Sequence, residues 1–177
     1  MYIERALETL VRRYSENFKI VAVTGPRQVG KTTMLKHLME EEAESGVDRV
    51  YVTLDNTAIL QTAKEDPALF LQRYRPPVLI DEIQKAPELL PYIKMIVDER
   101  DDCGSVWITG SQPLHLMKAV SESLAGRVGI VEMLGLSHSE VAGTPSEPYL
   151  PSADYFMRRV DMAKPFGVSE AYRQICA

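Results

Sequence analysis

The residues with the clearest capacity for chemistry form a glycine-bounded loop near the N-terminus. The segment GPRQVGKT, residues 25–32, fits the pattern G-x-x-x-x-G-K-[ST] at every fixed position. Glycines at both ends permit tight curvature, so that backbone N–H groups can wrap around a polyanion. The partial positive charge at the start of a following helix adds to the attraction. The pattern predicts nucleotide phosphate binding; the alternative is a glycine turn that only caps a helix.

Within this phosphate loop two side chains have distinct expected roles. Lys31 is expected to reach the β- and γ-phosphates, and the Thr32 hydroxyl is expected to ligate Mg²⁺. The residues expected to contact the nucleotide are Gly25, Pro26, Arg27, Gln28, Val29, Gly30, Lys31, Thr32 and Thr33.

An apolar segment further along the chain, VLIDE at residues 78–82, ends in two carboxylates. Asp81 is expected to hold Mg²⁺ through its water shell, and Glu82 to orient and polarise an attacking water. The alternative is that one of them merely caps the next helix. A second carboxylate favours nucleotide hydrolysis over a small-molecule kinase, which often uses basic groups to bind its acceptor.

Two further segments carry polar candidates. The segment ITGSQ, residues 108–112, places Thr109 and Ser111 at the end of an expected strand, where they would either face the γ-phosphate or form local turn hydrogen bonds. Arg127 follows an expected helix end at Gly126. It is either a surface group that complements the helix dipole or an arginine finger, acting within its own chain or on a second copy.

The elements that must position these residues alternate between helix and strand. An amphipathic helix is expected over residues 2–15, and further helices from Lys31, after Asp66-Pro67, near Pro87 or Pro91, and around residues 114–124. Short apolar strands are expected at residues 18–23, 50–54, 78–80, 106–109 and 128–134. This order predicts an α/β fold with a parallel sheet covered by helices on both faces, and ligands at the carboxyl ends of the strands.

The composition and charge of the chain indicate which classes of protein and which compartment to expect. Hydrophobic residues make up 45% and charged residues 25%, and the net charge is −5 without a basic run, so nothing indicates a nucleic-acid interface. Cys103 and Cys176 lack ligand-like spacing and are interpreted as free thiols in a reducing compartment. The N-terminus has no apolar leader, and no run of about 18 apolar residues occurs. A cytoplasmic protein without a membrane segment is expected.

The domain organisation changes near residue 143. Residues 1–142 are expected to form the core, and the stretch 143–152, which is rich in Pro, Ser and Gly, a linker. Residues 153–177 are too few for an independent core and are expected to form a helix or two.

Together the segments GPRQVGKTT, LIDEIQKAPELL, ITGSQ and SLAGR resemble the AAA-superfamily ATPases of bacteria and archaea. The likeness covers about residues 1–142 and implies a three-layer P-loop NTPase fold with a five-stranded, mainly parallel sheet. In that fold the first strand neighbours the fourth, and the third lies beyond it. Members usually carry a second C-terminal domain, so residues 153–177 would be its stump.

The same resemblance assigns roles and a function. It implies that Lys31 and Thr32 are Walker-A residues, that Asp81 and Glu82 are the Walker-B pair, and that Ser111 is sensor-like; Arg127 matches the arginine of the SLAGR block. It implies ATP as the nucleotide and Mg-dependent hydrolysis coupled to a conformational change. A regulatory nucleotide-binding module and a small-molecule kinase are the alternatives. A protein partner or second domain is expected, and a second copy of the chain if Arg127 acts between subunits.

Overall fold

The computed structural model describes residues 2–111, 123–143 and 157. The chain divides into two units, Met1–Pro145 and Ser146–Ala177, and all the elements named below belong to the first. Most of the helix expected around residues 114–124, and nearly all of the expected linker and C-terminal segment, lie outside the described residues.

The strands form one sheet in the order β2-β3-β4-β1-β5. Every neighbouring pair is parallel. The expected α/β fold is thereby confirmed, including the position of the first strand beside the fourth with the third beyond it. The strands are β1 Ile20–Thr24, β2 Val50–Thr53, β3 Val78–Asp81, β4 Val106–Gly110 and β5 Val128–Glu132.

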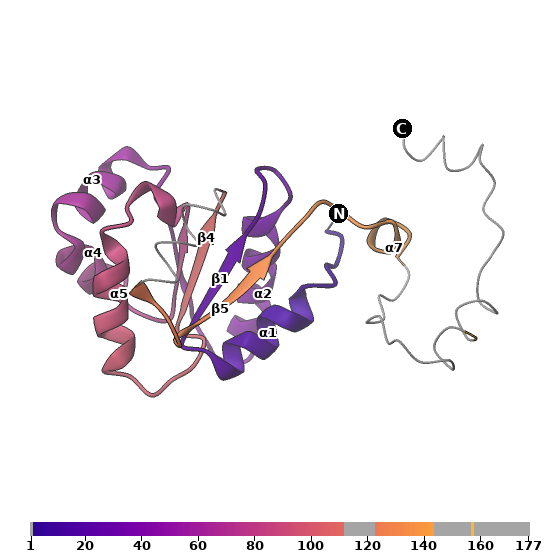
Figure 1. Ribbon diagram of the computed structural model, residues 1–177, viewed down its shortest axis with the longest axis horizontal. Helices are drawn as coiled ribbons and strands as arrows, with labels where there is room; N and C mark the ends of the chain where they lie inside the picture. Colours follow the sequence, from indigo (N-terminus) through magenta and orange to yellow (C-terminus); the bar gives the residue numbers. More distant parts are fainter. Residues whose placement is uncertain (1, 112–122, 144–156, 158–177) are drawn as a thin grey trace. The chain divides into compact units, whose positions relative to one another are not determined.

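Helices cover both faces of this sheet (Figure 1). The helices in the described ranges are α1 Glu8–Asn17, α2 Lys31–Glu44, α3 Thr57–Glu65, α4 Pro67–Arg73, the 3-10 turn η1 Ile83–Lys85, α5 Leu89–Asp98 and, on the chain that leaves β5 and away from the faces of the sheet, α7 His138–Val141. The predicted start of α4 is confirmed, because the Asp66 carboxylate caps the helix and Pro67 occupies its first turn. None of the helices in the described ranges is long and apolar enough to cross a membrane.

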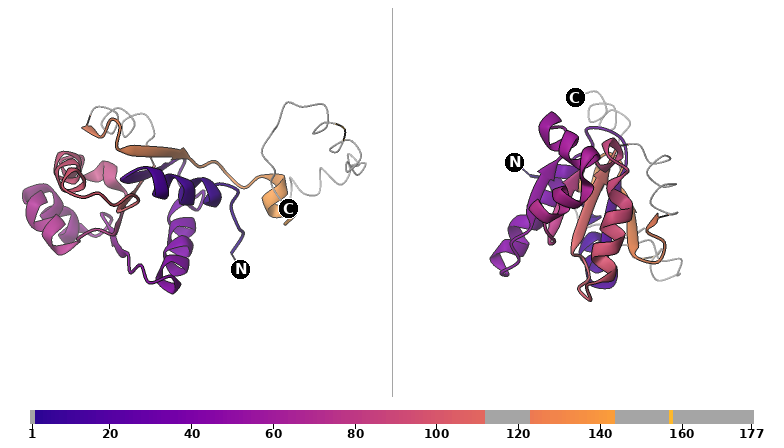
Figure 2. Two further views of the ribbon diagram at one scale, coloured as in Figure 1. Left: turned by 90° about the horizontal axis from the view of Figure 1, so that it is seen from below. Right: turned by 90° about the vertical axis from the view of Figure 1, so that its left-hand side faces the viewer.

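Successive side chains of the central strands pack alternately into two separate apolar clusters. In β1, Ile20 and Ala22 pack with the residues of α3, α4 and α5, whereas Val21 and Val23 pack with those of α1 and α2. Successive side chains of a strand point to opposite faces, so a strand buried on both sides is apolar throughout. Helix α1 runs along β5 (Figure 2). The result is three layers, with the sheet between two layers of helices.

The first helix begins later than expected. The prediction of a helix over residues 2–15 is wrong at its start, because α1 spans Glu8–Asn17. The Glu8 carboxylate accepts hydrogen bonds from the Arg5 backbone N–H at 2.8 Å and from the Tyr2 hydroxyl at 2.6 Å. These bonds hold the preceding residues in a non-helical path. The apolar spacing alone does not reveal this.

The strand register brings the candidate residues to one edge of the sheet. Thr24 at the end of β1 pairs with Gly110 of β4 and Glu132 of β5, and Thr53 of β2 pairs with Asp81 of β3. The phosphate loop follows Thr24 directly. The loop and the polar ends of β3 and β4 therefore share the carboxyl edge, where ligands of parallel sheets bind.

Candidate functional site

The backbone of the phosphate loop requires its two glycines. Gly25 has a φ of 138°, and a Cβ atom there would lie 2.0 Å from the carbonyl oxygen of Met133. Gly30 has a φ of 91° and forms the left-handed N-cap of α2. L-amino acids with side chains rarely adopt such angles. The spacing of the two glycines thus reflects a close approach to the end of β5 at one position and a sharp turn into α2 at the other.

The Lys31 side chain lies inside the loop. Its Nζ donates to the carbonyl oxygens of Gly25 at 2.9 Å and Pro26 at 2.6 Å. Burial lowers the pKa of the Lys31 ammonium, and the nearby carboxylates of Glu82 and Asp81 act in the opposite direction. A bound phosphate would have to compete with these two carbonyls for the ammonium hydrogens.

Asp81 receives hydrogen bonds from three directions. Its Oδ1 accepts from the Thr32 hydroxyl at 2.8 Å and from the Thr109 hydroxyl, and its Oδ2 accepts from the Tyr51 hydroxyl at 3.1 Å. Burial raises the pKa of Tyr51 to about 12, and the adjacent Asp81 carboxylate contributes in the same direction. The carboxylate is therefore fixed in position beside the hydroxyl that ends the loop motif.

Glu82 sits in an unusual backbone conformation. Its φ is 61°, a left-handed value that costs a non-glycine residue about 1–2 kcal/mol. The Glu82 N–H donates to the Thr109 hydroxyl at 3.1 Å, which holds the backbone after β3 against β4. Such strain, when observed, often marks a functional position.

The Glu82 carboxylate is held by two donors. Its Oε2 accepts from the Ser111 hydroxyl at 3.2 Å and from the Gln84 amide nitrogen. That nitrogen also donates to the Ser111 oxygen at 3.0 Å. The Gln84 Oε1 is buried and has no partner among the described residues. Glu82, Gln84 and Ser111 thus form one polar cluster at the ends of β3 and β4.

A cavity of about 490 Å³ opens at this edge of the sheet. Across it, Lys85 forms an ion pair with Asp55, with Nζ and Oδ1 2.5 Å apart. The lining residues are Arg27, Gln28, Gly30, Lys31, Thr32, Thr33, Asp55, Glu82 and Lys85. Loop residues, the Glu82 carboxylate and charged groups from two other segments therefore face one space.

The structure does not bring Arg127 to this cavity. Arg127 precedes β5 at the opposite, amino edge of the sheet, where its carbonyl accepts from the Ile20 N–H at 3.0 Å. Its guanidinium binds the Asp98 carboxylate through two hydrogen bonds of 2.5 and 2.9 Å. Of the alternatives left open for Arg127, this position favours a surface group over an arginine finger acting within its own chain. A role toward a second copy stays a prediction.

Sequence reasoning missed several participants. Tyr51 lies inside an apolar strand and carried no chemical signal of its own. Gln84 and Lys85 lie two and three positions after Glu82, so their proximity to the acidic pair was a usable signal. Asp55 comes just after β2, and only the strand order places it opposite Lys85.

Solved structures share this fold. Domain III of the replication initiation protein DnaA from Thermotoga maritima matches with a TM-score of 0.55 and 14% identity, over 78% of this chain and 67% of that one. AMPPCP-bound DnaA from Aquifex aeolicus gives a TM-score of 0.53 and 17% identity, over 75% and 48%. The DnaC helicase loader gives 0.51 and 14%, over 75% and 94%. At these identities the likeness concerns the fold alone.

Sequence comparison gives nearer relatives. Two proteins, Uncharacterized protein Rv2008c of Mycobacterium tuberculosis and Uncharacterized protein Mb2031c of Mycobacterium bovis, are each 33% identical over 148 residues. The match covers 83% of this chain and 32% of each relative, so the chain corresponds to about a third of their length. The sequence profile of the AAA domain matches residues 17–142, which include the phosphate loop and the acidic pair. The chain therefore belongs to the AAA-domain family, and membership implies ATP binding and hydrolysis in general terms.

Proposed function

We propose that this protein binds ATP with Mg²⁺ and hydrolyses it, and that hydrolysis is coupled to a conformational change. The observation that carries the proposal is the hydrogen bond of 2.8 Å between the Thr32 hydroxyl and the Asp81 carboxylate, with Glu82 next in the chain and lining the cavity together with Thr32. A hydroxyl, a metal-binding carboxylate and a second carboxylate in this order match the needs of phosphoryl transfer to water.

The donor set supports Mg²⁺ in particular. Thr32 and Asp81 offer hard oxygen atoms, which Mg²⁺ prefers, and few protein ligands suffice because the ion keeps waters and binds phosphate oxygens. In the described part of the chain no group of three or more His, Cys, Asp or Glu side chains forms a ready-made metal cage. Thr32 and Asp81 would hold the ion, which when bound would neutralise charge on the phosphates.

The positive groups of the loop would bind the phosphates. Lys31 would exchange its hydrogen bonds to the Gly25 and Pro26 carbonyls for bonds to phosphate oxygens. The N-terminus of α2 would supply backbone N–H groups and partial positive charge. Arg27 and Lys85 line the same cavity and add further positive charge.

Glu82 would act on the water. Its carboxylate would accept a proton from the attacking water, while Ser111 and Gln84 keep it oriented through their hydrogen bonds to Oε2. Since Ser111 is bonded to Glu82, it would also lie close to the terminal phosphate, as expected of a sensor-like position.

A regulatory module that binds nucleotide without turnover is the second candidate. The observation that favours it is the position of Arg127 at the amino edge of the sheet, where it binds Asp98 and does not face the cavity of its own chain. In that case hydrolysis would require an arginine from a partner or a second copy.

The test is phosphate release from Mg-ATP by the purified chain, with Mg-GTP in parallel. Lys31→Ala should weaken nucleotide binding, with Lys64→Ala on the exposed face of α3 as the control. Glu82→Gln should retain binding and lose turnover, with the exposed Glu88→Gln as its control. Normal turnover in Glu82→Gln would refute the assigned role. Binding without turnover in the unmodified chain at any concentration would support the regulatory module instead.

A further inference from the structure

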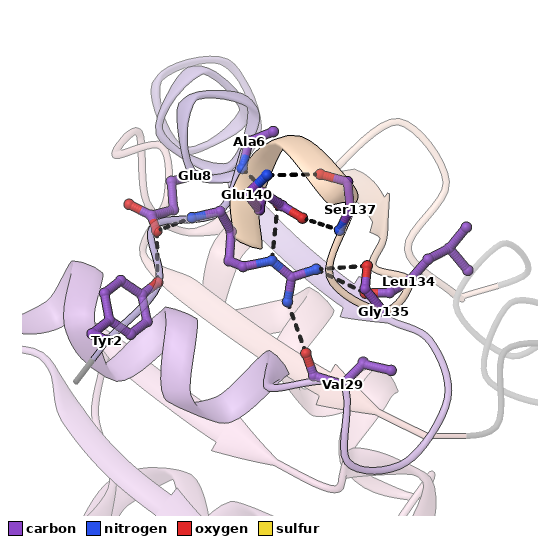
Figure 3. Close-up of polar contacts among 9 residues, drawn as sticks. Tyr2, Ala6, Glu8, Val29, Leu134, Gly135, Ser137 and Glu140 are labelled. Atoms are coloured by element: carbon purple, nitrogen blue, oxygen red, sulfur yellow. Dashed lines mark hydrogen bonds and ion pairs between the residues drawn. The ribbon is translucent and has the colours of Figure 1, made fainter. Parts of the chain in front are cut away.

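Arg5 connects three parts of the chain that are distant in sequence. Its side chain is 6% exposed. Its Nη1 donates to the Val29 carbonyl in the phosphate loop at 2.8 Å, and its Nη2 donates to the carbonyls of Leu134 at 2.8 Å and Gly135 at 3.2 Å. Its Nε binds Glu140 Oε1 at 3.0 Å. Figure 3 shows these carbonyls and the Glu140 carboxylate around the guanidinium.

The phosphate loop also rests directly on the chain that leaves β5. The space where a Cβ of Gly25 would lie is filled by the Met133 carbonyl. A Cβ at Gly30 would lie 3.8 Å from the Met133 Cε and 3.9 Å from the Arg5 Nη1. Gly25 at the start of the loop is thus packed against the Met133 backbone, and Gly30 at its end lies near the Met133 and Arg5 side chains. A change in loop geometry cannot occur without altering these contacts.

Glu140 binds the Arg5 side chain within residues 134–140, the segment that Arg5 joins to the phosphate loop. Its Oε1 accepts from Arg5 Nε and from the Ala6 N–H at 2.9 Å, and its Oε2 accepts from the Ser137 N–H at 2.6 Å. The Ser137 hydroxyl in turn accepts from the Glu140 N–H, which completes a capping box at the start of α7. Burial alone would raise the pKa of Glu140, but these hydrogen bonds lower it to about 2.

We propose that Arg5 is a positioning residue that couples the phosphate loop to residues 134–140, so that nucleotide bound at the loop tightens this segment. The segment leads out of the ATPase core toward the residues that follow position 143. The inference rests on the proposed nucleotide binding and deepens it. Lysine cannot replace arginine here, because one ammonium cannot reach acceptors in both segments in the fixed geometry of a guanidinium.

The test is hydrogen exchange in the full chain, followed in peptides that cover residues 25–31 and 134–143. Four proteins are compared: the unmodified chain, Arg5→Lys, Glu140→Gln, and Arg13→Lys as a matched substitution at an exposed position of α1. Each is measured alone and with Mg-AMPPCP, and binding of Mg-AMPPCP is measured separately by calorimetry. Circular dichroism checks that each variant is folded.

Without nucleotide, Arg5→Lys should accelerate hydrogen exchange of the 25–31 peptide about tenfold. Glu140→Gln should accelerate it to the same degree, although Glu140 does not itself contact the loop. In the unmodified chain and Arg13→Lys, Mg-AMPPCP should slow exchange of the 134–143 peptide. In Arg5→Lys that slowing should be lost while binding persists, a loss that a purely structural role would not produce.

Two results would overturn the coupling. One is unchanged exchange of the 25–31 peptide in Glu140→Gln. The other is Mg-AMPPCP binding to the unmodified chain with no effect on the 134–143 peptide. If calorimetry detects no Mg-AMPPCP binding, the proposed function is refuted, and with it the proposal that nucleotide tightens residues 134–140. The nucleotide-free comparison would then still decide whether Arg5 links the two segments.

Discussion

The Thr32 hydroxyl donates a hydrogen bond to Asp81 at 2.8 Å, although 49 positions of sequence separate the two residues. One belongs to the first turn of α2 and the other to the last position of β3. Their proximity follows from the strand order, in which only β4 lies between β1 and β3. The pair joins the two motifs on which the proposed magnesium chemistry depends.

Asp81→Asn should raise the Mg²⁺ concentration that gives half-maximal ATP turnover by about tenfold or more, because the amide keeps the shape but removes the charge. The measurement is phosphate release across a Mg²⁺ titration. Asp48→Asn, at an exposed position outside any element, is the control and should leave the titration unchanged. A titration of Asp81→Asn that overlays that of the unmodified chain would remove Asp81 from the metal site.

Gln84→Met should lower ATP turnover about tenfold while nucleotide affinity stays the same, since the Glu82 carboxylate loses a donor that orients it. Steady-state kinetics and equilibrium binding measure the two effects separately. Gln72→Met on the exposed surface of α4 should change neither quantity. A loss of affinity equal to the loss of turnover would show that Gln84 supports the nucleotide rather than Glu82.

Gly25→Ala and Gly46→Ala separate the cost of backbone strain from the cost of a steric clash when a glycine is replaced. Both glycines have positive φ values, but a Cβ at Gly46 meets nothing within 4 Å, whereas one at Gly25 meets the Met133 carbonyl. Gly46→Ala should lower the free energy of unfolding by about 1 kcal/mol, from backbone strain alone. Gly25→Ala should lower it by about 3 kcal/mol or more and weaken nucleotide binding. Urea unfolding measures both, and equal losses would show that the close approach is relieved at no cost.

Glu140 should contribute to stability in a manner that depends on pH. Its pKa is lowered from 4.5 to about 2 in the folded chain, so the unfolded chain binds more protons between these values. The contribution, on the order of 2 kcal/mol, should be complete above about pH 5 and should decline as the pH falls toward 2. The difference in unfolding free energy between the unmodified chain and Glu140→Gln should therefore shrink over that range.

Urea unfolding between pH 6 and 2.5 tests this expectation. Glu44→Gln, at an exposed position of α2, is the control and should give a small difference that does not change with pH. A constant difference between the unmodified chain and Glu140→Gln would mean that the hydrogen bonds to Glu140 do not favour its charged form.

The sequence by itself determined the class of fold and the chemistry of the loop. Short apolar strands alternating with amphipathic helices allow few arrangements other than a covered parallel sheet. The phosphate loop is contiguous, so its glycines, Lys31 and Thr32 could be recognised together. Asp81 and Glu82 could be recognised because they end an apolar strand. The first helix was misplaced at its start because Tyr2 and Arg5 bond to Glu8, which apolar spacing does not report.

Only the tertiary structure decided which distant side chains meet. Tyr51 reaches Asp81 because β2 pairs with β3, and Arg127 meets Asp98 because both lie at the amino edge of the sheet. Arg5 reaches Val29, Leu134 and Glu140 because the phosphate loop rests on the chain that leaves β5. Such contacts depend on strand order, register and the paths of the connections. Residue type and spacing within one segment therefore leave them undetermined, whereas packing of the whole core fixes them.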